Sequence, residues 1–214
     1  MSRRPFHRIG EAERRQDLME ATLDCISEFG LQGATVRRIA ARAGVTPGLI
    51  RHYFSSKDQM LQDAYRHVMT GMTQAVAAAG DRGQENARAR LHDFIVANLT
   101  PPVADGKALS FWAAFISHVR AEPAFAEIHR ESYLAFRSAL EVLVADVLAE
   151  AGEKPDPLRC QKLAIAINAV IDGLWIEGTL VADLFADTPL PDIAIRSVEA
   201  LLGGIRLTAD NHSN

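Results

Sequence analysis

The stretch AGVTPGLIRHYFSSKDQML, residues 43–61, decides the fold because it holds the signals for a tight turn between two short helices. Gly44 is placed to end a first helix as its C′ residue. Thr46 followed by Pro47 is an N-cap with proline at the first helical position, so a second short helix is expected to end near Phe54. The stretch therefore predicts two short helices joined by a turn.

The segments on either side of this stretch also have helical spacing. Upstream, apolar residues share one helical face over about residues 11–28, and Gly30 is expected to stop that helix. Thr35 can cap the first of the two short helices, and a long helix over residues 56–80 follows them. Three N-terminal helices with a tight turn between the last two are typical of a helix-turn-helix.

Helical spacing continues to the end of the chain, and no stretch alternates convincingly between apolar and polar residues. Further helices are expected over about residues 85–98, 107–120, 124–152, 158–184 and 192–207, with prolines at the breaks. The sequence predicts an all-α fold of about nine helices. A composition shift places the expected domain boundary between residues 1–57 and residues 58–214.

Charge is distributed unevenly along the 214 residues. The whole chain has a net charge of −4, but residues 1–57 contain ten Lys and Arg against six Asp and Glu, and the remainder contains thirteen against twenty-one. A basic front suggests binding to a polyanion such as DNA. The alternative is that this asymmetry is a chance fluctuation.

The sequence shows no pattern typical of an enzyme, a metal site or a cofactor site. Cys25 and Cys160 lie far apart and in no CxxC or Cys/His spacing, and His67, His92, His118 and His129 show no ligand pattern. There is no Gly-rich phosphate loop and no nucleophile elbow. We therefore expect no catalytic residues, no metal and no cofactor.

A cytoplasmic location is expected. No apolar region follows the N-terminal twin arginine, so no signal peptide is predicted. The longest strongly apolar run, residues 163–176, is interrupted by Asn168 and Asp172 and is shorter than the roughly 20 residues that span a bilayer. This run is expected to be a buried helix and not a membrane anchor.

The second short helix is the candidate reader of DNA, because the N-terminal residues of such a helix lie nearest the base edges in the major groove. One turn later, Arg51 can offer its planar fork to guanine or to a phosphate. The alternative for each arginine taken singly is a solvated surface charge. The candidate DNA-binding residues are Thr35, Arg37, Arg38, Thr46, Pro47, Gly48, Leu49, Arg51, His52, Tyr53 and Lys57.

The segment GLQGATVRRIAARAGVTPGLIRHYFSSKDQML, residues 30–61, resembles the DNA-binding signature of the TetR family of transcriptional regulators. Its glycines, its IA and AGV motifs and its YF pair stand where that family has them. The resemblance implies a repressor that binds a palindromic double-stranded DNA operator as a homodimer and is released by a small molecule. Most of the family has a tyrosine at the position of Arg51, which suggests a different operator here.

The back half is similar to the BetI subgroup, in FWAAF at residues 111–115 and AVIDGLWIEGTL at residues 169–180. That subgroup represses glycine-betaine synthesis genes and responds to choline, and it shares its C-terminal domain type with regulators of other ligands. The resemblance implies an effector pocket in this half and a dimer formed by the last two long helices. A choline-like cation is one expected effector, and an apolar ligand from an unrelated metabolic or efflux pathway is the other. A helical interaction protein that does not bind DNA is the alternative from a different functional class.

The predicted ligand-binding residues are Phe111, Trp112, Phe115, Tyr133, Phe136, Asn168, Asp172 and Trp175. Asp172 and Trp175 lie one helical turn apart and could hold a cation by charge and by the ring face. The alternative is that the aromatic residues are core and that Asp172 pairs with an arginine or caps a kink. Arg3, Arg4 and Arg8 form either an arm for the minor groove or a tail.

Overall fold

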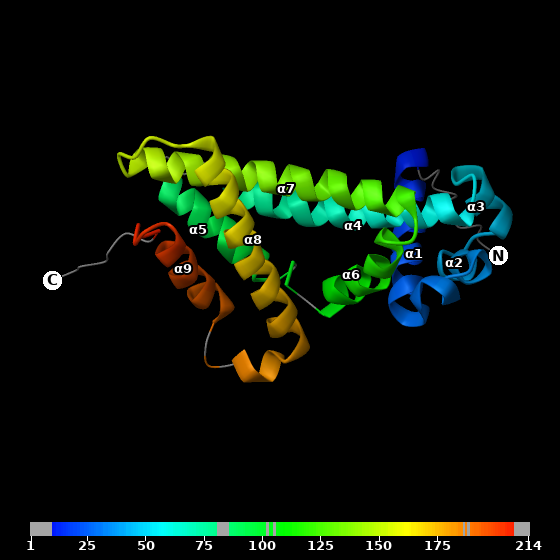
Figure 1. Cartoon of the computed structure of the whole chain (residues 1–214). Coiled ribbons are helices and arrows are strands. Elements are labelled where there is room, and N and C mark those ends of the chain that lie inside the picture. Colours follow the sequence, from blue (N-terminus) through cyan, green and yellow to red (C-terminus); the bar gives the residue numbers. More distant parts are fainter. Residues whose placement is uncertain are drawn as a thin grey trace. The chain divides into compact units, whose positions relative to one another are not determined.

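The computed structural model describes residues 10–80, 86–101, 103–104, 106–185, 187 and 189–207. Within these residues the chain is helical and has no strand, which confirms the all-α prediction (Figure 1). The elements are α1 (Glu11–Gly33), α2 (Val36–Arg42), α3 (Pro47–Tyr53), α4 (Lys57–Gly80), α5 (Ala87–Asn98), α6 (Gly106–Val119), α7 (Pro123–Glu150), α8 (Pro157–Leu180), the 3-10 helix η1 (Ala182–Phe185) and α9 (Leu190–Leu201).

The chain divides into two compact units. The first unit comprises Met1–His67 and Ser110–Ile128, and the second comprises Val68–Leu109 and His129–Asn214. Helices α4, α6 and α7 therefore each contribute residues to both units. The first unit extends beyond the boundary expected after residue 57. That this boundary separates a DNA-binding part from an effector-binding part remains a prediction.

Two capped turns define α2 and α3. The Thr35 hydroxyl accepts a hydrogen bond from the backbone N–H of Arg38 at 3.3 Å, and the Thr46 hydroxyl accepts one from the backbone N–H of Leu49 at 3.4 Å. Gly44 between the helices has a φ of +64°, a left-handed conformation that side chains other than glycine rarely adopt. The turn chemistry expected from the sequence is therefore present at both helix starts.

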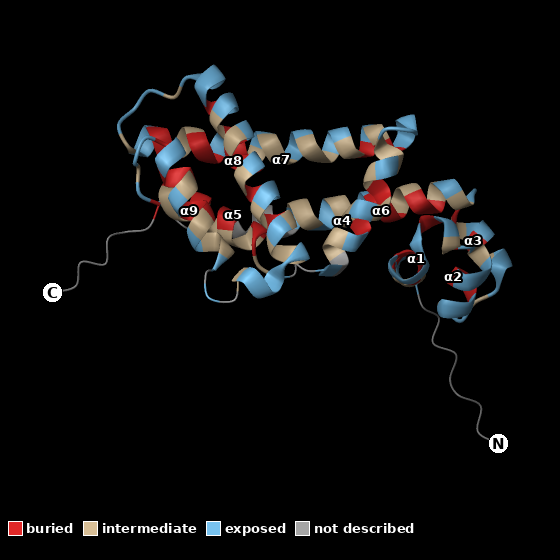
Figure 2. Ribbon diagram, turned by 60° about the horizontal axis from the view of Figure 1, so that its bottom comes forward, coloured by how far each residue is buried: buried red, intermediate tan, exposed pale blue. Residues whose placement is uncertain are grey.

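Burial holds these two helices in place. Each has only seven residues, too few for an isolated helix to persist in water. Ile39 and Ala40 of α2, Ile50 of α3 and Phe54 after it are all at most 2% exposed. Figure 2 marks buried residues in red and exposed residues in pale blue on these helices. The short helices therefore depend on packing against the rest of the unit.

An aromatic cluster forms another part of the first unit's core. The rings of Tyr65 and Phe115 stack with centroids 4.7 Å apart, and Phe125 lies 5.9 Å from Tyr65 and 5.8 Å from Phe115. All three are at most 2% exposed, and burial raises the pKa of Tyr65 to about 12. The cluster joins α4 to the end of α6 and the start of α7.

Polar contacts fasten the helices of the second unit to one another. Glu150 at the end of α7 accepts a hydrogen bond from the backbone N–H of Ala87 at 2.6 Å and pairs with Arg88 at 3.0 Å, which anchors the start of α5. Arg90 pairs with Asp146 of α7 at 2.7 Å. The bond from Ala87 satisfies one of the backbone N–H groups that the first turn of a helix leaves unpaired, and the two ion pairs connect α5 to α7.

Helix α1 breaks at Gly30 as expected, because Gly30 is non-helical with a φ of 68°, and a short second helical segment extends the element to Gly33. Two other helix ends differ from the prediction. Helix α8 ends at Leu180 and is followed by η1, so the helix expected up to residue 184 is interrupted. The last helix ends at Leu201 and not at Leu207.

The early end of α9 has a local cause. Gly203 and Gly204 both have positive φ and turn the chain back. The buried carboxylate of Glu199 then accepts a hydrogen bond from the backbone N–H of Leu207 at 2.9 Å and pairs with Arg206 at 2.9 Å. The buried acid is satisfied by the turned chain, and Leu207 packs as a buried residue.

Helix α8 is long enough, at 24 residues with a mean hydropathy of 1.5 in its most apolar window, to cross a membrane by length and composition. The interrupted run of residues 163–176 did not indicate this. Length and composition are weak evidence for a span, because a core helix of a soluble protein has the same properties. Most of the contacts of α8 with other elements are with α9 and η1.

Phe115→Ala should lower the free energy of unfolding by about 3 to 5 kcal/mol, because it removes a buried ring that packs against two others. Phe115→Leu should cost less, since it keeps much of the apolar volume. Urea unfolding followed by circular dichroism measures both. Equal losses below about 1 kcal/mol in both variants would show that the cluster is not part of the core.

Candidate nucleic-acid interface and effector site

One surface of the first unit gathers the exposed candidate DNA-binding residues. They lie at the start of α2, in the turn before α3 and along the outer side of α3. Thr35, Arg37, Arg38, Thr46, Pro47, Gly48, Arg51 and His52 are exposed, and Leu49, Tyr53 and Lys57 are half-buried. The N-terminal end of α3, with its small residue Gly48, is thus open to close approach by a ligand as large as DNA.

Two arginines on this surface carry charge that the protein does not neutralise. Arg37 on α2 and Arg51 on α3 are exposed, and neither guanidinium has a hydrogen bond or ion pair within the part of the chain that the structure describes. Such groups are available to phosphates or base edges. Arg3, Arg4 and Arg8 of the expected arm lie outside the described residues.

Other basic residues of this region are engaged internally. Arg38 donates a hydrogen bond to the backbone carbonyl of Gly33 at 2.9 Å and lies over the ring of Phe29 at 4.5 Å. Arg42 pairs with Glu28 and lies 3.7 Å from Asp24, both on α1. Both arginines therefore fix α2 to α1, a role that helical spacing alone did not reveal.

Lys57 at the start of α4 also has an internal partner. Its ammonium group donates a hydrogen bond to the backbone carbonyl of Leu31 at 3.3 Å. It lines a groove of about 240 Å³ together with Leu31, Gln32, Asp58, Leu61, His118, Glu122 and Phe125. This volume is below the roughly 300 Å³ at which ligand pockets usually begin, and half of its lining is ionisable. The groove is therefore a poor match for an effector site.

The predicted ligand-binding residues are divided between the two units. Phe111, Trp112 and Phe115 belong to the first unit, where Phe115 has no accessible surface. Tyr133, Phe136, Asn168, Asp172 and Trp175 belong to the second unit. That these eight residues line one pocket remains a prediction.

Asn168, Asp172 and Trp175 have separate hydrogen-bonding roles on α8. The amide of Asn168 donates to the Asp172 carboxylate at 2.8 Å, and the indole N–H of Trp175 donates to the backbone carbonyl of Val103 at 3.0 Å. Trp175 is buried, whereas Asp172 keeps exposed surface. No arginine pairs with Asp172 among the residues described, so the alternative of an Asp–Arg pair has no support here.

Asp172 is an exposed residue whose carboxyl is nevertheless partly desolvated by the protein around it. Burial raises the pKa of its carboxyl above the ordinary value of 3.8, and the hydrogen bond from Asn168 acts in the opposite direction. A carboxylate that is held in an unfavourable environment without a cationic partner is a candidate ligand contact. This observation is consistent with the predicted cation site.

Sequence reasoning missed a row of interacting aromatic and charged side chains on α7. Arg137 lies over the ring of Tyr133 at 5.6 Å and pairs with Glu141 at 3.2 Å. The Arg137 side chain is only 16% exposed, and the hydrogen bonds with Tyr133 and Glu141 raise the pKa of its guanidinium. The spacing 133, 137 and 141 is one residue per helical turn, which is the sequence signal that could have found it.

Two family models match the chain and together cover both halves. The model described as bacterial regulatory proteins, tetR family, matches residues 18–64, which contain α2 and α3. The model described as BetI-type transcriptional repressor, C-terminal, matches residues 87–203.

Two relatives, each matched over most of its length, support the same assignment. The HTH-type transcriptional regulator BetI of Burkholderia thailandensis is 31% identical over 189 residues, which are 88% of this chain and 93% of the relative. Another BetI, from Paraburkholderia phymatum, is 32% identical over 180 residues, covering 83% of this chain and 88% of the relative.

Solved structures share the fold. A proposed transcriptional regulator from Pseudomonas aeruginosa PAO1 has a TM-score of 0.79 and 32% identity, with 92% of each chain covered. A proposed regulator from Saccharomonospora viridis in complex with choline has a TM-score of 0.70 and 19% identity, covering 90% of this chain and 97% of its own. The regulator FadR from Bacillus subtilis in complex with stearoyl-CoA has a TM-score of 0.68 and 19% identity, covering 89% of this chain and 99% of its own. At 19% identity, the last two support the fold alone.

Asp172→Asn should stabilise the protein at neutral pH. Because burial favours the neutral acid, the stability linked to Asp172 is full below the ordinary pKa of 3.8 and is lost as the pH rises through the raised pKa of the folded state. Asparagine stays neutral, so the variant should be more stable than wild type near pH 7, and the difference should shrink toward about pH 4.

Urea unfolding at about pH 7 and about pH 4.5 measures this difference. Glu177→Gln removes an exposed acid from the same helix and corrects for the change in net charge. A difference between wild type and Asp172→Asn that is the same at both pH values would contradict the assignment of a raised pKa to Asp172.

Proposed function

Because this chain belongs to the TetR family of bacterial regulatory proteins and has a BetI-type C-terminal domain, we propose that it is a ligand-responsive repressor that binds a palindromic operator as a homodimer. Like its relatives, it is a transcriptional regulator and not an enzyme. The observation that carries the proposal is the exposed surface of α2 and α3, on which Arg37 and Arg51 have no partner among the described residues. A cytoplasmic location follows from this function.

In the proposed complex, α3 enters the major groove with Thr46, Pro47, Gly48 and Leu49 toward the base edges. Arg51 contacts a guanine or a phosphate, and Arg37 and His52 contact the backbone. Two copies of α3 read half-sites about one helical turn apart, roughly 34 to 36 Å. Tyr53 and Lys57 contact phosphates at the edge of the surface, and Thr35 and Arg38 support it through their internal contacts.

The homodimer is proposed to form through α8 and α9. Several large apolar residues of this region are exposed in the single chain, namely Leu158, Ile165, Leu180, Val181, Leu184 and Leu201. Exposed apolar residues in such number on neighbouring helices are typical of an oligomer interface. A methyl group added at Gly173 would meet no atom within 4 Å, which leaves room for a second helix to approach α8. An interface of this kind also accounts for the apolar composition of α8 without a membrane.

A small organic cation is the proposed effector. The solved regulator in complex with choline has this fold, and Asp172 on α8 is a carboxylate whose side-chain hydrogen bond, among the residues described, comes from the amide of Asn168. An apolar effector is the second candidate, because another protein of this fold is in complex with stearoyl-CoA. The effector is proposed to act by binding more tightly to a conformation that does not fit the operator, since a ligand shifts an equilibrium only by its differential affinity.

Arg51→Ala should weaken operator binding by about 1 to 3 kcal/mol and relax the preference at one base position, if Arg51 reads a base edge. Lys57→Ala should weaken binding to all sequences alike and lower the slope of affinity against salt by about one. Fluorescence anisotropy with the operator and with single-base variants, over a range of salt concentrations, measures both effects. If neither variant changes operator binding, α3 is not the reader helix; if wild type binds no DNA, the chain is a helical interaction protein.

Choline should bind the protein below millimolar concentration and weaken operator binding, because a cation can be held by the Asp172 carboxylate. Calorimetry with choline, betaine aldehyde and simple amines measures the affinity. Asp172→Asn should abolish this binding, whereas Glu177→Gln, on the same helix, should keep it. Binding of none of these cations, together with binding of a fatty acyl thioester, would favour the apolar effector.

A further inference from the structure

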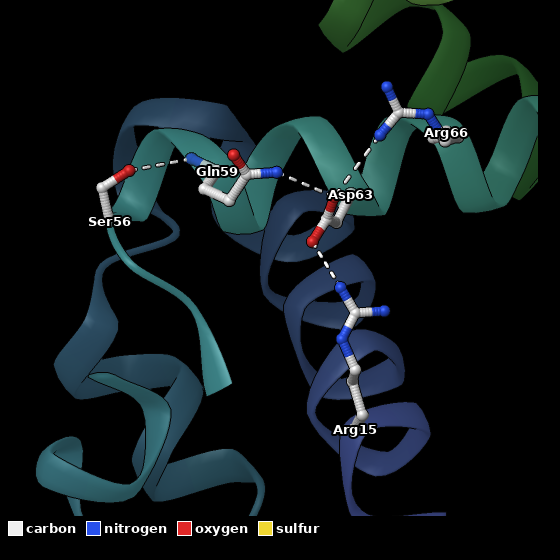
Figure 3. Close-up of polar contacts among 5 residues, drawn as sticks. All are labelled: Arg15, Ser56, Gln59, Asp63 and Arg66. Carbon is white, nitrogen blue, oxygen red and sulfur yellow. Dashed lines mark hydrogen bonds and ion pairs between the residues drawn. The ribbon is translucent and has the colours of Figure 1, made fainter. Parts of the chain in front are cut away.

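A hydrogen-bond network in the first unit centres on Asp63 of α4 (Figure 3). The carboxylate accepts a hydrogen bond from Arg15 of α1 at 2.6 Å, from Gln59 at 3.0 Å and from Arg66 at 3.5 Å. Its side chain is only 11% exposed. Gln59 and Arg66 lie on the same helix as Asp63, so Arg15 is the partner that connects α4 to another helix.

Arg15 makes a second contact that leads to the reader helix. Its guanidinium lies over the ring of Phe54 at 5.3 Å, within the range of a cation–π interaction. Phe54 is the C-cap residue of α3, it is 2% exposed, and its backbone N–H donates to the carbonyl of Ile50 at 2.9 Å. One guanidinium therefore contacts both a half-buried acid of α4 and the residue that ends α3.

The covalent link between α3 and α4 is short. Only Phe54, Ser55 and Ser56 separate the two helices, and the Ser56 hydroxyl caps α4 by accepting a hydrogen bond from the backbone N–H of Gln59 at 3.0 Å. Such a cap fixes the start of α4 and does not fix the direction of α3. Burial of Ile50 and Phe54 constrains α3, and the contact of Arg15 with Phe54 and Asp63 adds a constraint that involves both helices.

We infer that Arg15, held by Asp63, is a positioning residue for operator binding that fixes the orientation of α3 relative to the start of α4. The inference rests on the proposed function, in which two copies of α3 must fit half-sites at one spacing. With the Arg15–Asp63 ion pair intact, each α3 has one orientation, and an operator with altered half-site spacing is strongly disfavoured. Without this ion pair, α3 binds DNA with a less defined orientation.

A purely structural role for Arg15 makes a different prediction. If the ion pair only stabilises the packing of α1 on α4, its loss lowers the free energy of unfolding, and the folded protein keeps its preference for one half-site spacing. The spacing preference is therefore the readout that separates the two roles. It is the ratio of the dissociation constants for an operator with one inserted base pair at its centre and for the unaltered operator.

The adjacent residue offers a matched control. Arg14 pairs with Asp17 on the same helix at 3.4 Å, so Arg14→Gln removes one positive charge next to Arg15 without the loss of an ion pair between helices in the described part of the chain. The operator is first selected from random DNA by the wild-type protein. Anisotropy titrations then compare wild type, Arg14→Gln, Arg15→Gln, Arg15→Lys, Asp63→Asn and the double variant Arg15→Gln with Asp63→Asn, and circular dichroism checks that each is folded.

Arg15→Gln and Asp63→Asn should each weaken binding to the unaltered operator about tenfold and should reduce the spacing ratio by a similar factor relative to Arg14→Gln. The double variant should lose no more than either single change, because the two residues act as one unit. Arg15→Lys should fall between Arg15→Gln and wild type, since lysine keeps the charge but not the planar fork.

The inference is overturned if folded Arg15→Gln and the folded double variant keep the spacing ratio of Arg14→Gln. Failure of the proposed function gives a different result, because the wild-type protein would then select no operator from random DNA. Should Asp63→Asn fail to fold, Arg15→Gln and the double variant still decide the outcome.

Discussion

The proposed DNA-binding surface depends on one constraint, which is that helices of seven residues are not stable in water unless the rest of the protein holds them. Helices α2 and α3 meet this constraint by burying Ile39, Ile50 and Phe54 and by capping both starts with threonine. Their outer sides are then free to carry polar and basic residues. The position of Arg51 is thus a consequence of core packing on the opposite side of α3.

The same constraint explains how the basic residues of this region are used. Arg38 and Arg42 fasten α2 to α1, and Arg15 connects α1 to α4 and to the end of α3. Arg37 and Arg51 have no such partners within the described residues. A basic stretch that looks uniform in sequence is therefore divided between charges that hold the helices together and charges that remain available to DNA.

The sequence was sufficient for the fold class, because glycine, proline and threonine act locally: Gly44, Thr46 and Pro47 have in the structure the conformations and bonds that their types predict. Helix ends that depend on distant partners were not predictable in this way. The end of α9 follows from the bonds of Glu199 to Leu207 and Arg206, and apolar spacing contains no information about them.

At the candidate sites, too, local features were predictable and contacts with distant residues were not. Helical spacing placed Asn168, Asp172 and Trp175 on one face without showing that Trp175 is buried and Asp172 exposed. Nor could spacing show that Lys57 and Arg38 hold internal carbonyl groups, because the side of a helix that meets a neighbour is decided by residues outside the helix.

DNase I footprinting of the wild-type protein on the DNA upstream of its own gene tests most directly whether the outer side of α3 and its neighbours bind an operator as a pair of copies. We expect protection of a palindrome whose two halves lie about one helical turn, or a small multiple of it, apart, and loss of this protection as salt is raised. Absence of any sequence-selective protection at low salt would contradict this reading of the surface.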